Sequence, residues 1–339
     1  SFDCFQNLRR LLFGRTVRVF NFDWRKSFFQ FREPNSELAY ALEVDRFQGG
    51  ARTVQMIIQA RIIKHLLFGE QQGALVAALS DSLWLAGQEE SATVTMVTED
   101  YCHQPYLDHK LDLLTEKMQM FVFNRKENLS SFLLDHIQCF QEEGGHGVIL
   151  FLYSLVCSRT IDDLDSSTAQ LLQCSLGNFV CSQALLNLLL TGRATPYVFN
   201  ATQAVGGDVA PVDPPLQGVL SRGDIGYLHW SREQMDRGRL PQVGSMLKTP
   251  RFPVWLCCIN STYSVLFSLT RSLLSNWRTE HQFQLFYYNG QNSQKTTARL
   301  TVTHSHHWEA PSSDSDVDPE KRFPSLEMTI RTKWEGASI

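Results

Sequence analysis

The stretch FQGGARTVQMIIQARIIKHLLF, residues 47–68, carries the strongest structural signal in the chain. The pair Gly49–Gly50 predicts a tight turn, because glycine adopts left-handed backbone angles without steric cost. Helical spacing of apolar residues from Thr53 to Phe68 then predicts an amphipathic helix. The apolar stripe consists of Val54, Ile58, Ile62 and Leu66, widened by Ile57, Ile63 and Leu67. Arg52 stands between the turn and the helix.

The composition of the chain is that of a globular protein with a large core. Of 339 residues, 43% are apolar, including 22 Phe and 7 Trp, so a substantial interior can be buried. The net charge is only −4, and we expect no nucleic-acid partner. The longest nearly apolar run, GVILFLYSLVC, is too short to cross a bilayer, so we expect no membrane span.

The first residues and the cysteines both favour an intracellular protein. Residues 1–20 contain four arginines and do not resemble a secretory signal, so we expect an intracellular, cytoplasmic location. The eight cysteines form no CxxC pair and mostly lie in apolar runs such as VWLCCIN, which predicts reduced, buried thiols.

The first half of the chain is mainly helical in pattern. Residues 1–46 form a lead-in with a short helix and an irregular aromatic segment, and a second helix is predicted near 72–87. SATVTMVTE and KMQMFVF alternate at period two and predict strands. ENLSSFLLDHIQCF predicts a helix capped by its Asn or Ser. GVILFLYSLVCSR fits a buried helix or a strand equally, and TAQLLQCSLGNFVCSQALLNLLLTG predicts a helix that ends at its glycine.

The second half changes from helices to strands. Residues 194–223 are rich in Gly and Pro and predict a long surface connection. Tight turns separate several of the following strand candidates, which predicts a largely antiparallel sheet. Residues 309–325 are acidic and rich in Pro and Ser, and we expect a mobile loop. Together these patterns predict one α+β domain over 1–339. The strand candidates are FPVWLCCIN, YSVLFSL, FQLFYYNG, ARLTVTHSH and EMTIRTKW.

Neither a metal nor a cofactor is predicted. THSHHWE contains His304, His306 and His307, but His307 points away from the other two on a strand, and no further ligands are evident. An exposed strand end is the simpler interpretation. ATQAVGGDVAP has two glycines without the spacing of a phosphate-binding loop.

The turn and helix at residues 49–68 match what a cysteine nucleophile requires. A helix N-terminus favours the thiolate, because its free N–H groups and dipole attract negative charge. A glycine turn lets the backbone approach a scissile carbonyl and direct amides at the oxyanion. A histidine from a distant strand then accepts the proton. In this chain the turn and helix are present, but Arg52 replaces the thiol.

Several long motifs resemble one protein family. GGARTVQMIIQARIIKHLLF resembles the Gly-Gly-Pro-Cys segment and following helix of the MINDY deubiquitinases, in the branch of members three and four. Other hallmarks of that branch resemble downstream stretches in the same order, so the resemblance covers nearly the whole chain from residue 40. These stretches are ALLNLLLTGRA, GDIGYLHW, VGSMLKTPRFPVWLCCINSTYSVLFS, WRTEHQFQLFYYNGQ and IRTKWEGAS.

The resemblance implies a papain-like cysteine protease fold. It also implies an activity that cleaves isopeptide bonds in ubiquitin chains. The family's nucleophilic Cys falls on Arg52, and the Pro before it falls on Ala51. Its catalytic His falls on Thr262 in NSTYSVLFS. Its oxyanion Gln falls on Arg46, or on Gln48 after a small shift of the turn, and a third residue that orients the His falls on Asn289.

These replacements predict loss of the family's chemistry. A guanidinium cannot act as a nucleophile, and a threonine hydroxyl is no base near neutral pH. We therefore expect a pseudoenzyme whose partner is ubiquitin or polyubiquitin. Two alternatives stay open: an interaction scaffold that no longer binds ubiquitin, and a divergent hydrolase that uses another thiol such as Cys257 or Cys258.

Overall fold

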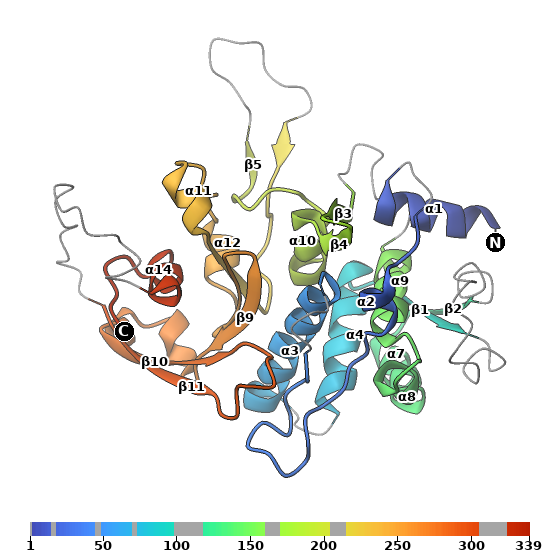
Figure 1. Cartoon of the computed structure of the whole chain (residues 1–339), viewed down its shortest axis with the longest axis horizontal. Helices are drawn as coiled ribbons and strands as arrows, with labels where there is room; N and C mark the ends of the chain where they lie inside the picture. Colours follow the sequence, from blue (N-terminus) through green and yellow to red (C-terminus); the bar gives the residue numbers. More distant parts are fainter. Residues whose placement is uncertain are drawn as a thin grey trace. The chain divides into compact units, whose positions relative to one another are not determined.

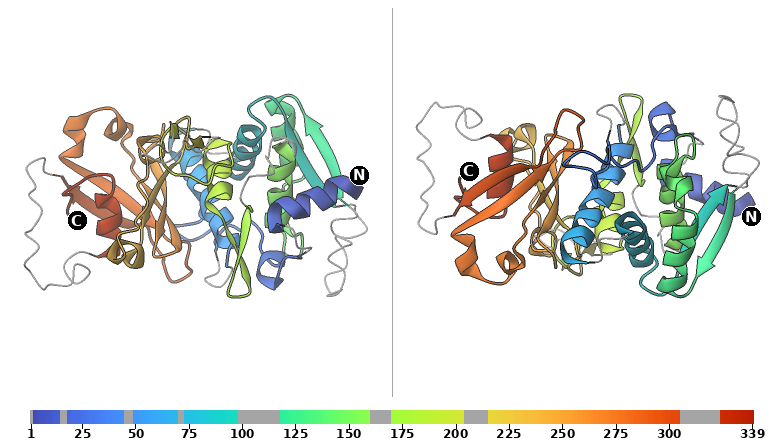
Figure 2. Two further views of the ribbon diagram at one scale, coloured as in Figure 1. Left: turned by 90° about the horizontal axis from the view of Figure 1, so that it is seen from above. Right: turned by 90° about the horizontal axis from the view of Figure 1, so that it is seen from below.

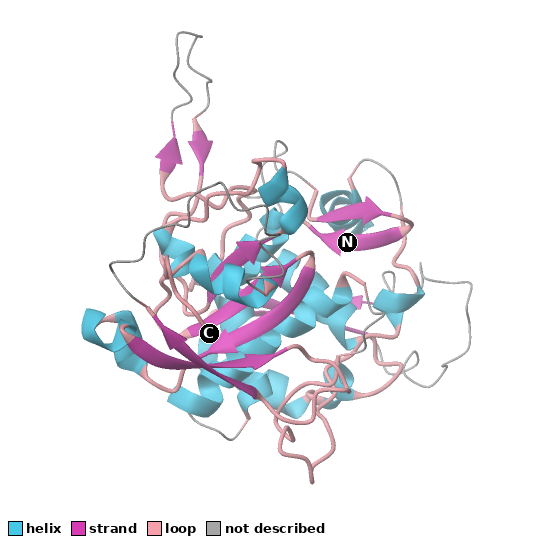
Figure 3. Cartoon of the chain, turned by 60° about the vertical axis from the view of Figure 1, so that its left-hand side comes forward, coloured by secondary structure: helices cyan, strands magenta, loops and turns pink. Residues whose placement is uncertain are grey.

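The computed structural model describes residues 2–14, 18–44, 49–69, 73–97, 118–159, 170–203, 215–304 and 324–339. They form two compact units, Ser1–Tyr197 and Val198–Ile339. Helices dominate the first unit and strands the second, so the predicted α+β class is confirmed (Figures 1 and 3). That both units belong to one domain stays a prediction.

Helix α3 (Ala51–Phe68) and helix α4 (Ala74–Ala86) lie at the centre of the first unit. Each was predicted from apolar spacing, and both begin within a few residues of the predicted position. α4 contacts α3 and three further helices, α7, α9 and α10 (Figure 1). The other helices of the unit are α1 (Phe2–Phe13), α2 (Phe22–Arg25), α7 (Lys126–Asp135), α8 (Gln138–Gln141), α9 (Gly147–Ser158) and α10 (Gln183–Thr191).

Helix α3 is buried on every side from Ala51 to Lys64, whereas the sequence predicted an amphipathic helix with a solvated face. Its polar side chains are accommodated because other segments supply hydrogen-bond partners. Gln59 accepts a bond from the backbone N–H of Leu42 at 2.5 Å, and Arg61 donates to the Leu189 carbonyl at 2.7 Å. These partners lie far away in the sequence, so helical periodicity could not reveal them.

The last turns of α3 are held by an ion-pair cluster around Asp81 of α4. Lys64 and His65 contact one carboxylate oxygen at 2.7 and 2.8 Å, and Lys126 contacts the other at 2.6 Å. Burial by itself raises the pKa of Asp81, but the His65 hydrogen bond and the charges of Lys64, Arg61 and Lys126 hold this pKa well below its usual range. The cluster therefore joins α3, α4 and α7 through one largely buried carboxylate.

Two predicted strands form the hairpin of β1 (Ala92–Val97) and β2 (Met118–Phe123), which is antiparallel. The segment that fitted helix or strand equally is helix α9, which packs against β1 (Figure 2). The hydroxyls of Ser154 and Ser158 on α9 accept hydrogen bonds from backbone N–H groups of β1, at 2.8 and 2.9 Å. α9 thus satisfies donors that a two-stranded sheet leaves unpaired.

The predicted helix over 168–192 is wrong in its first half. Residues 170–181 contain an antiparallel hairpin of β3 (Leu172–Ser175) and β4 (Asn178–Cys181). Leu176 and Gly177 both have positive φ, at 49° and 83°, and form its tight turn. The second half is α10, which Ser182 caps through a hydrogen bond from the Leu185 N–H and which ends at Gly192 as predicted.

The predicted N-terminal cap of helix α7 is also wrong. Helix α7 begins at Lys126, before Asn128, and its N-terminal residue Arg125 makes no side-chain capping bond. Ser130 lies inside the helix and bonds instead to the Ser80 hydroxyl of α4 at 2.8 Å. Packing against α4 decides the start of α7, because tertiary contacts outweigh a single cap.

The second unit is built on one five-stranded sheet, in the order β11-β10-β9-β8-β7. Four strands were predicted, and their neighbours pair antiparallel as expected. β7 pairs parallel to β8, because α11 (Arg232–Asp236) and α12 (Ser245–Lys248) lie in the connection between these two strands. The strands are β7 (Gly226–Trp230), β8 (Val254–Ile259), β9 (Thr262–Phe267), β10 (Gln282–Tyr288) and β11 (Ala298–Thr303).

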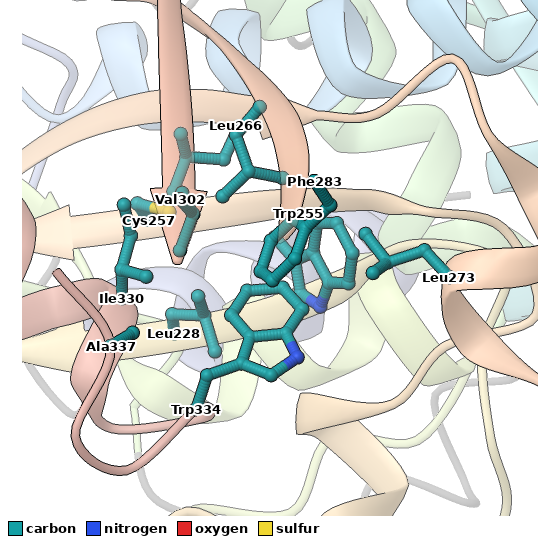
Figure 4. Packing of buried hydrophobic residues seen from close by; sticks show 11 residues of the cluster. Leu228, Trp255, Cys257, Leu266, Leu273, Phe283, Val302, Ile330, Trp334 and Ala337 are labelled. Carbon is teal, nitrogen blue, oxygen red and sulfur yellow. The ribbon is translucent and has the colours of Figure 1, made fainter. Parts of the chain in front are cut away.

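One face of this sheet carries the apolar core of the second unit. Trp255 and Trp334 meet edge to face with ring centroids 5.5 Å apart, and Phe283 lies 4.7 Å from Trp334 (Figure 4). Cys257 points into the same cluster, so its thiol serves as a small apolar side chain. The 3-10 helices η2 (Arg271–Leu274) and η3 (Trp277–Glu280) connect β9 with β10.

The fifth strand candidate, EMTIRTKW, is instead helix α14 (Ser325–Arg331). The prediction is wrong because Met328 and Ile330 fit both a strand and a helix over so short a run. Glu327 and Arg331 pair one helical turn apart at 3.0 Å, and Ile330 packs into the core beside Trp334. α14 lies against β7 and β8.

The remaining connections agree only in part with expectation. Within the predicted connection 194–223, β5 (Thr202–Gln203) and β6 (Leu216–Gln217) form a short antiparallel pair, and 204–214 lie outside the described residues. The acidic segment predicted to be mobile lies outside them except for its last two residues. No helix in the described part of the chain is both long and apolar enough to span a bilayer.

Candidate functional site

The predicted Gly-Gly turn and helix occur together at the start of α3. Gly49 has a φ of 53°, a left-handed angle that favours glycine, and Gly50 is the residue from which the helix begins. The Thr53 N–H donates to the Gly50 carbonyl at 3.1 Å. The first turn of α3 has no acidic residue and no side-chain cap. The N-terminus of a helix carries a partial positive charge, so it can stabilise a negatively charged side chain or ligand.

Gly50 is required by packing rather than by its backbone angles, because its φ of −69° suits any residue. A Cβ atom at this position would lie 2.1 Å from the Phe179 carbonyl and 2.9 Å from the Val180 Cα of β4. The Trp24 indole N–H donates to the same Phe179 carbonyl at 2.9 Å. The backbone at the start of α3 is therefore pressed against β4. The sequence indicated a close backbone approach here, but to a substrate rather than to a strand of the same unit.

Arg52 is the second residue of α3, and only 7% of its surface is exposed. A guanidinium stays protonated at every working pH. The position predicted from the sequence to correspond to the nucleophile therefore holds a fixed positive charge inside the first unit. Because the helix dipole is positive at this end, the charge opposes it.

A cysteine that the sequence did not single out lies beside this turn. The Sγ of Cys181, at the end of β4, donates to the Gly50 carbonyl at 3.4 Å. Burial raises the pKa of its thiol to about 12, and a hydrogen bond with Thr53 lowers it only slightly against this effect. Cys181 is thus held as a neutral thiol. Only the contact of β4 with α3 brings it here, and no local sequence pattern signals that contact.

Thr262 lies in the second unit, at the first position of β9. It pairs with Ile259 across the tight turn of Asn260 and Ser261, whose φ angles are 47° and 64°. The Thr262 side chain is exposed. An exposed hydroxyl has no proton affinity near neutral pH, so this position cannot supply a general base.

Asn289 directly follows β10 at the same end of the sheet. β10 pairs with β9 up to Tyr288 opposite Val265. Because β9 and β10 are antiparallel, the start of β9, where Thr262 lies, and the end of β10, which Asn289 follows, lie toward the same end of the sheet. The Asn289 side chain accepts a hydrogen bond from the Gln291 N–H at 2.9 Å. The second unit therefore brings Thr262 and Asn289 to one end of its sheet.

The other predicted site residues are only partly described. Arg46 and Gln48, the two candidates for the oxyanion position, lie outside the described residues. Gly49, Gly50 and Arg52 gather at the start of α3 in the first unit. Their expected relation to Thr262 and Asn289 in the second unit stays a prediction.

Cys257 and Cys258, the two adjacent cysteines of β8, do not readily form a thiolate. Burial raises the pKa of Cys257, and the neighbouring Cys258 adds to this effect. Burial also raises the pKa of Cys258, although hydrogen bonds with Tyr263 and Tyr227 oppose it. All six cysteines with described side chains are thiols outside any disulfide, but the prediction of burial holds fully only for Cys257 and Cys258. Cys174 is exposed, and Cys139, Cys157 and Cys181 are partly buried.

Cys139 and His146 in the first unit line a cavity of about 10 Å³. That volume holds roughly one water molecule. His146 bonds through Nδ1 to the Arg25 carbonyl at 2.8 Å, and burial lowers its pKa. The cavity is too small for a peptide substrate.

The predicted histidine group is only partly described. His304 follows β11, whereas His306 and His307 lie outside the described residues. Within the described ranges, no three His, Cys, Asp or Glu side chains are placed to share a metal ion.

Comparison with known proteins identifies the family of the chain. Residues 9–339 match the model of the conserved domain of the deubiquitinating enzyme MINDY-3/4. The chain is 34% identical over 360 aligned positions to the human protein described as probable ubiquitin carboxyl-terminal hydrolase MINDY-4, covering 98% of this chain and 44% of that protein. The mouse MINDY-4 protein is 33% identical, with 98% and 45% covered.

A more distant relative is ubiquitin carboxyl-terminal hydrolase MINDY-3 of Xenopus tropicalis. It is 25% identical over 277 aligned positions, covering 68% of this chain and 58% of the relative. The chain spans less than half the length of the MINDY-4 relatives above. No match was found among solved structures. Because the family model covers nearly all residues, this chain belongs to the MINDY-3/4 family of deubiquitinating enzymes, which has a cysteine protease fold.

Proposed function

We propose that this chain is a catalytically inactive member of its family that acts by binding ubiquitin or polyubiquitin. The observation that carries the proposal is Arg52. It is buried, lies two residues after Gly50 and is the second residue of α3. The resemblance to the family implies that the nucleophilic cysteine falls at this position. A permanent cation at this position cannot attack a carbonyl carbon.

The position of the general base supports the same proposal. Thr262 cannot accept the proton of a thiol near neutral pH. In a serine protease, loss of the nucleophile or the base alone lowers kcat on the order of a million-fold. With both replaced, the chain has no covalent route to an isopeptide bond through these positions.

A binding role is supported by what the chain retains. The relatives are named as ubiquitin carboxyl-terminal hydrolases, and the family model runs through both units. The turn, α3 and the β8–β9 hairpin of the family pattern all form. A surface that once recognised ubiquitin can outlast the chemistry, because recognition uses many contacts besides those with the reacting atoms.

A ubiquitin–propargylamide probe tests inactivity directly, because a catalytic thiol attacks its alkyne and becomes covalently joined to ubiquitin. We expect no adduct with this chain, as seen by intact-mass spectrometry. An adduct would contradict the proposal. Its loss on changing Cys181, Cys257 or Cys258 to Ser would then identify the nucleophile of a divergent hydrolase.

A titration with ubiquitin and with ubiquitin chains tests the binding role. We expect saturable binding by calorimetry or by NMR shifts. If neither ubiquitin form binds at high concentration, the binding role is wrong, and the chain is an interaction scaffold with another partner. The probe experiment and the titration fail independently, so inactivity and binding can be judged separately.

A further inference from the structure

The second unit contains an open pocket of about 600 Å³ beside the turn that follows α12. Its walls come from three separate segments: the turn before β7, the turn after α12, and η2. Three of its lining residues are arginines, Arg222, Arg251 and Arg271, all of which are exposed. The proposed ubiquitin-directed role does not use this pocket.

Arg222 is fixed in place by uncharged acceptors. Its Nη1 donates to the backbone carbonyls of Ser245 and Thr249, at 3.1 and 2.6 Å. These two bonds hold the guanidinium at the end of α12 without neutralising its charge. The remaining N–H groups of the fork are thus oriented before any ligand arrives.

The other two arginines are also little neutralised. Arg251 lies 3.7 Å from the Asp224 carboxylate, a long contact between partly exposed side chains that contributes little. The Arg271 guanidinium lies 4.5 Å from the centre of the Phe252 ring, which orients it without supplying an anion. Both guanidinium groups can accept a further negative partner.

Two lysines add positive charge next to the pocket. Lys333 donates to the hydroxyl of Thr249, a lining residue, at 3.0 Å. Burial lowers the pKa of Lys333 to about 8. The charge of Glu280 opposes this shift, and the charges of Lys248 and Arg222 add to it. Three arginines therefore line the pocket and two lysines lie next to it. Among the described residues, Asp224 contacts Arg251, and the charge of Glu280 acts on Lys333.

We propose that this pocket binds a dianionic phosphate group. A carboxylate offers two oxygens and satisfies one guanidinium fork, whereas a phosphate monoester offers three charged oxygens and can bridge all three arginines. The hydroxyls of Ser272 and Ser275 also line the pocket and can donate to the same group. The source is a phosphorylated protein side chain or a small phosphate-bearing molecule.

Calorimetric titration of the full chain with O-phosphoserine tests the proposal. We expect saturable binding to the wild type, no binding of serine, and weaker binding of glutamate. Arg271→Gln should weaken phosphoserine binding about tenfold, and Arg251→Gln with Arg271→Gln about a hundredfold, because each bond to a charged group is worth at least a factor of ten. Arg222 is left intact, since its loss would remove two structural hydrogen bonds.

Arg299→Gln is the matched control, because Arg299 is an exposed arginine of β11 outside the pocket. It should leave binding within about twofold of the wild type, since surface charges far from a ligand are screened by salt. Equal weakening by Arg299→Gln and Arg271→Gln, or no binding to the wild type, would overturn the proposal.

A five-residue peptide with a central phosphoserine separates the two sources. If the peptide binds more tightly than free phosphoserine, the ligand is a phosphorylated protein segment, because flanking residues then contribute. If both bind equally, the ligand is a small phosphate-bearing molecule. Either result supports a phosphate pocket only if Arg271→Gln weakens it.

Discussion

Arg52 and Thr262, the two positions at which we propose that catalytic residues are replaced, lie in opposite kinds of environment. Arg52 is buried at the start of α3, where the backbone is pressed against β4 and its neighbours Gly50 and Thr53 contact Cys181. Thr262 is exposed beside the two-residue turn between β8 and β9. A change at Arg52 must therefore fit a packed interior, whereas a change at Thr262 meets mostly solvent.

This difference separates two ways of losing an activity. A replaced base at an exposed strand end can be restored with little effect on the fold, because surface substitutions seldom change stability by more than about 0.5 kcal/mol. A buried cation at a helix N-terminus becomes part of the packing around it. The start of α3 should therefore limit any recovery of chemistry more than the β8–β9 hairpin does.

The largest expected effect comes from restoring both positions. Arg52→Cys with Thr262→His should turn a chain that forms no adduct into one labelled by ubiquitin–propargylamide in reducing buffer. A thiol at a helix N-terminus gains thiolate character, and the imidazole supplies a base. Adding Arg46→Gln should strengthen labelling if that position supplies the oxyanion contact.

The matched control is Arg52→Ser with Thr262→His, which keeps the base but has no thiol at position 52. It should stay unlabelled. If the double and triple variants keep the melting temperature of the wild type yet form no adduct, positions 52 and 262 do not share a site.

The next largest effect concerns the C-terminal end of α3. The ion-pair cluster around Asp81 stabilises this end, whereas no side chain caps the N-terminal end. Asp81→Asn should lower the free energy of unfolding by about 3–5 kcal/mol at pH 7, because the buried Lys64 ammonium loses its carboxylate partner. Urea denaturation measures this loss. Asp236→Asn is the control: Asp236 meets Arg232 at 3.7 Å at an exposed site, and the change should cost less than about 0.5 kcal/mol.

The same cluster gives a pH dependence. The pKa of Asp81 is lower in the folded than in the unfolded chain, so its contribution to stability is complete above the unfolded value of about 4. The contribution is lost as pH falls below that value toward the folded pKa. Between about pH 4 and pH 2, the wild type should lose more stability than Asp81→Asn, and parallel curves would contradict this assignment.

A smaller effect tests how closely the start of α3 packs against β4. Gly50→Ala should destabilise the protein by about 1–3 kcal/mol, because its Cβ would meet the Phe179 carbonyl and Val180. Gly49→Ala meets no atom within 4 Å and should cost only about 1 kcal/mol, through its left-handed φ. Thermal unfolding measures both changes. Equal losses would show that close packing on β4 does not account for glycine at position 50.

The sequence predicted the elements whose signals are local. The Gly49–Gly50 turn, α3, α4, the two strands β1 and β2, and the antiparallel strands β8 to β11 all appear in its apolar spacing and turn residues. It failed at residues 170–181 and 327–334, where a short apolar run fits more than one structure. There the turn at Leu176 and Gly177 and the packing of Ile330 and Trp334 made the choice.

The sequence by itself determined which residues follow the Gly49–Gly50 turn and which residue begins β9, because identity and spacing are written in the chain. From these it predicted that Arg52 and Thr262 stand in place of the family's thiol and imidazole. The tertiary structure alone decided that α3 is buried on every side and that Cys181 lies beside Gly50. It also decided that Arg222, Arg251 and Arg271 line one pocket. These features depend on contacts between residues far apart in the sequence, which no local period or motif encodes.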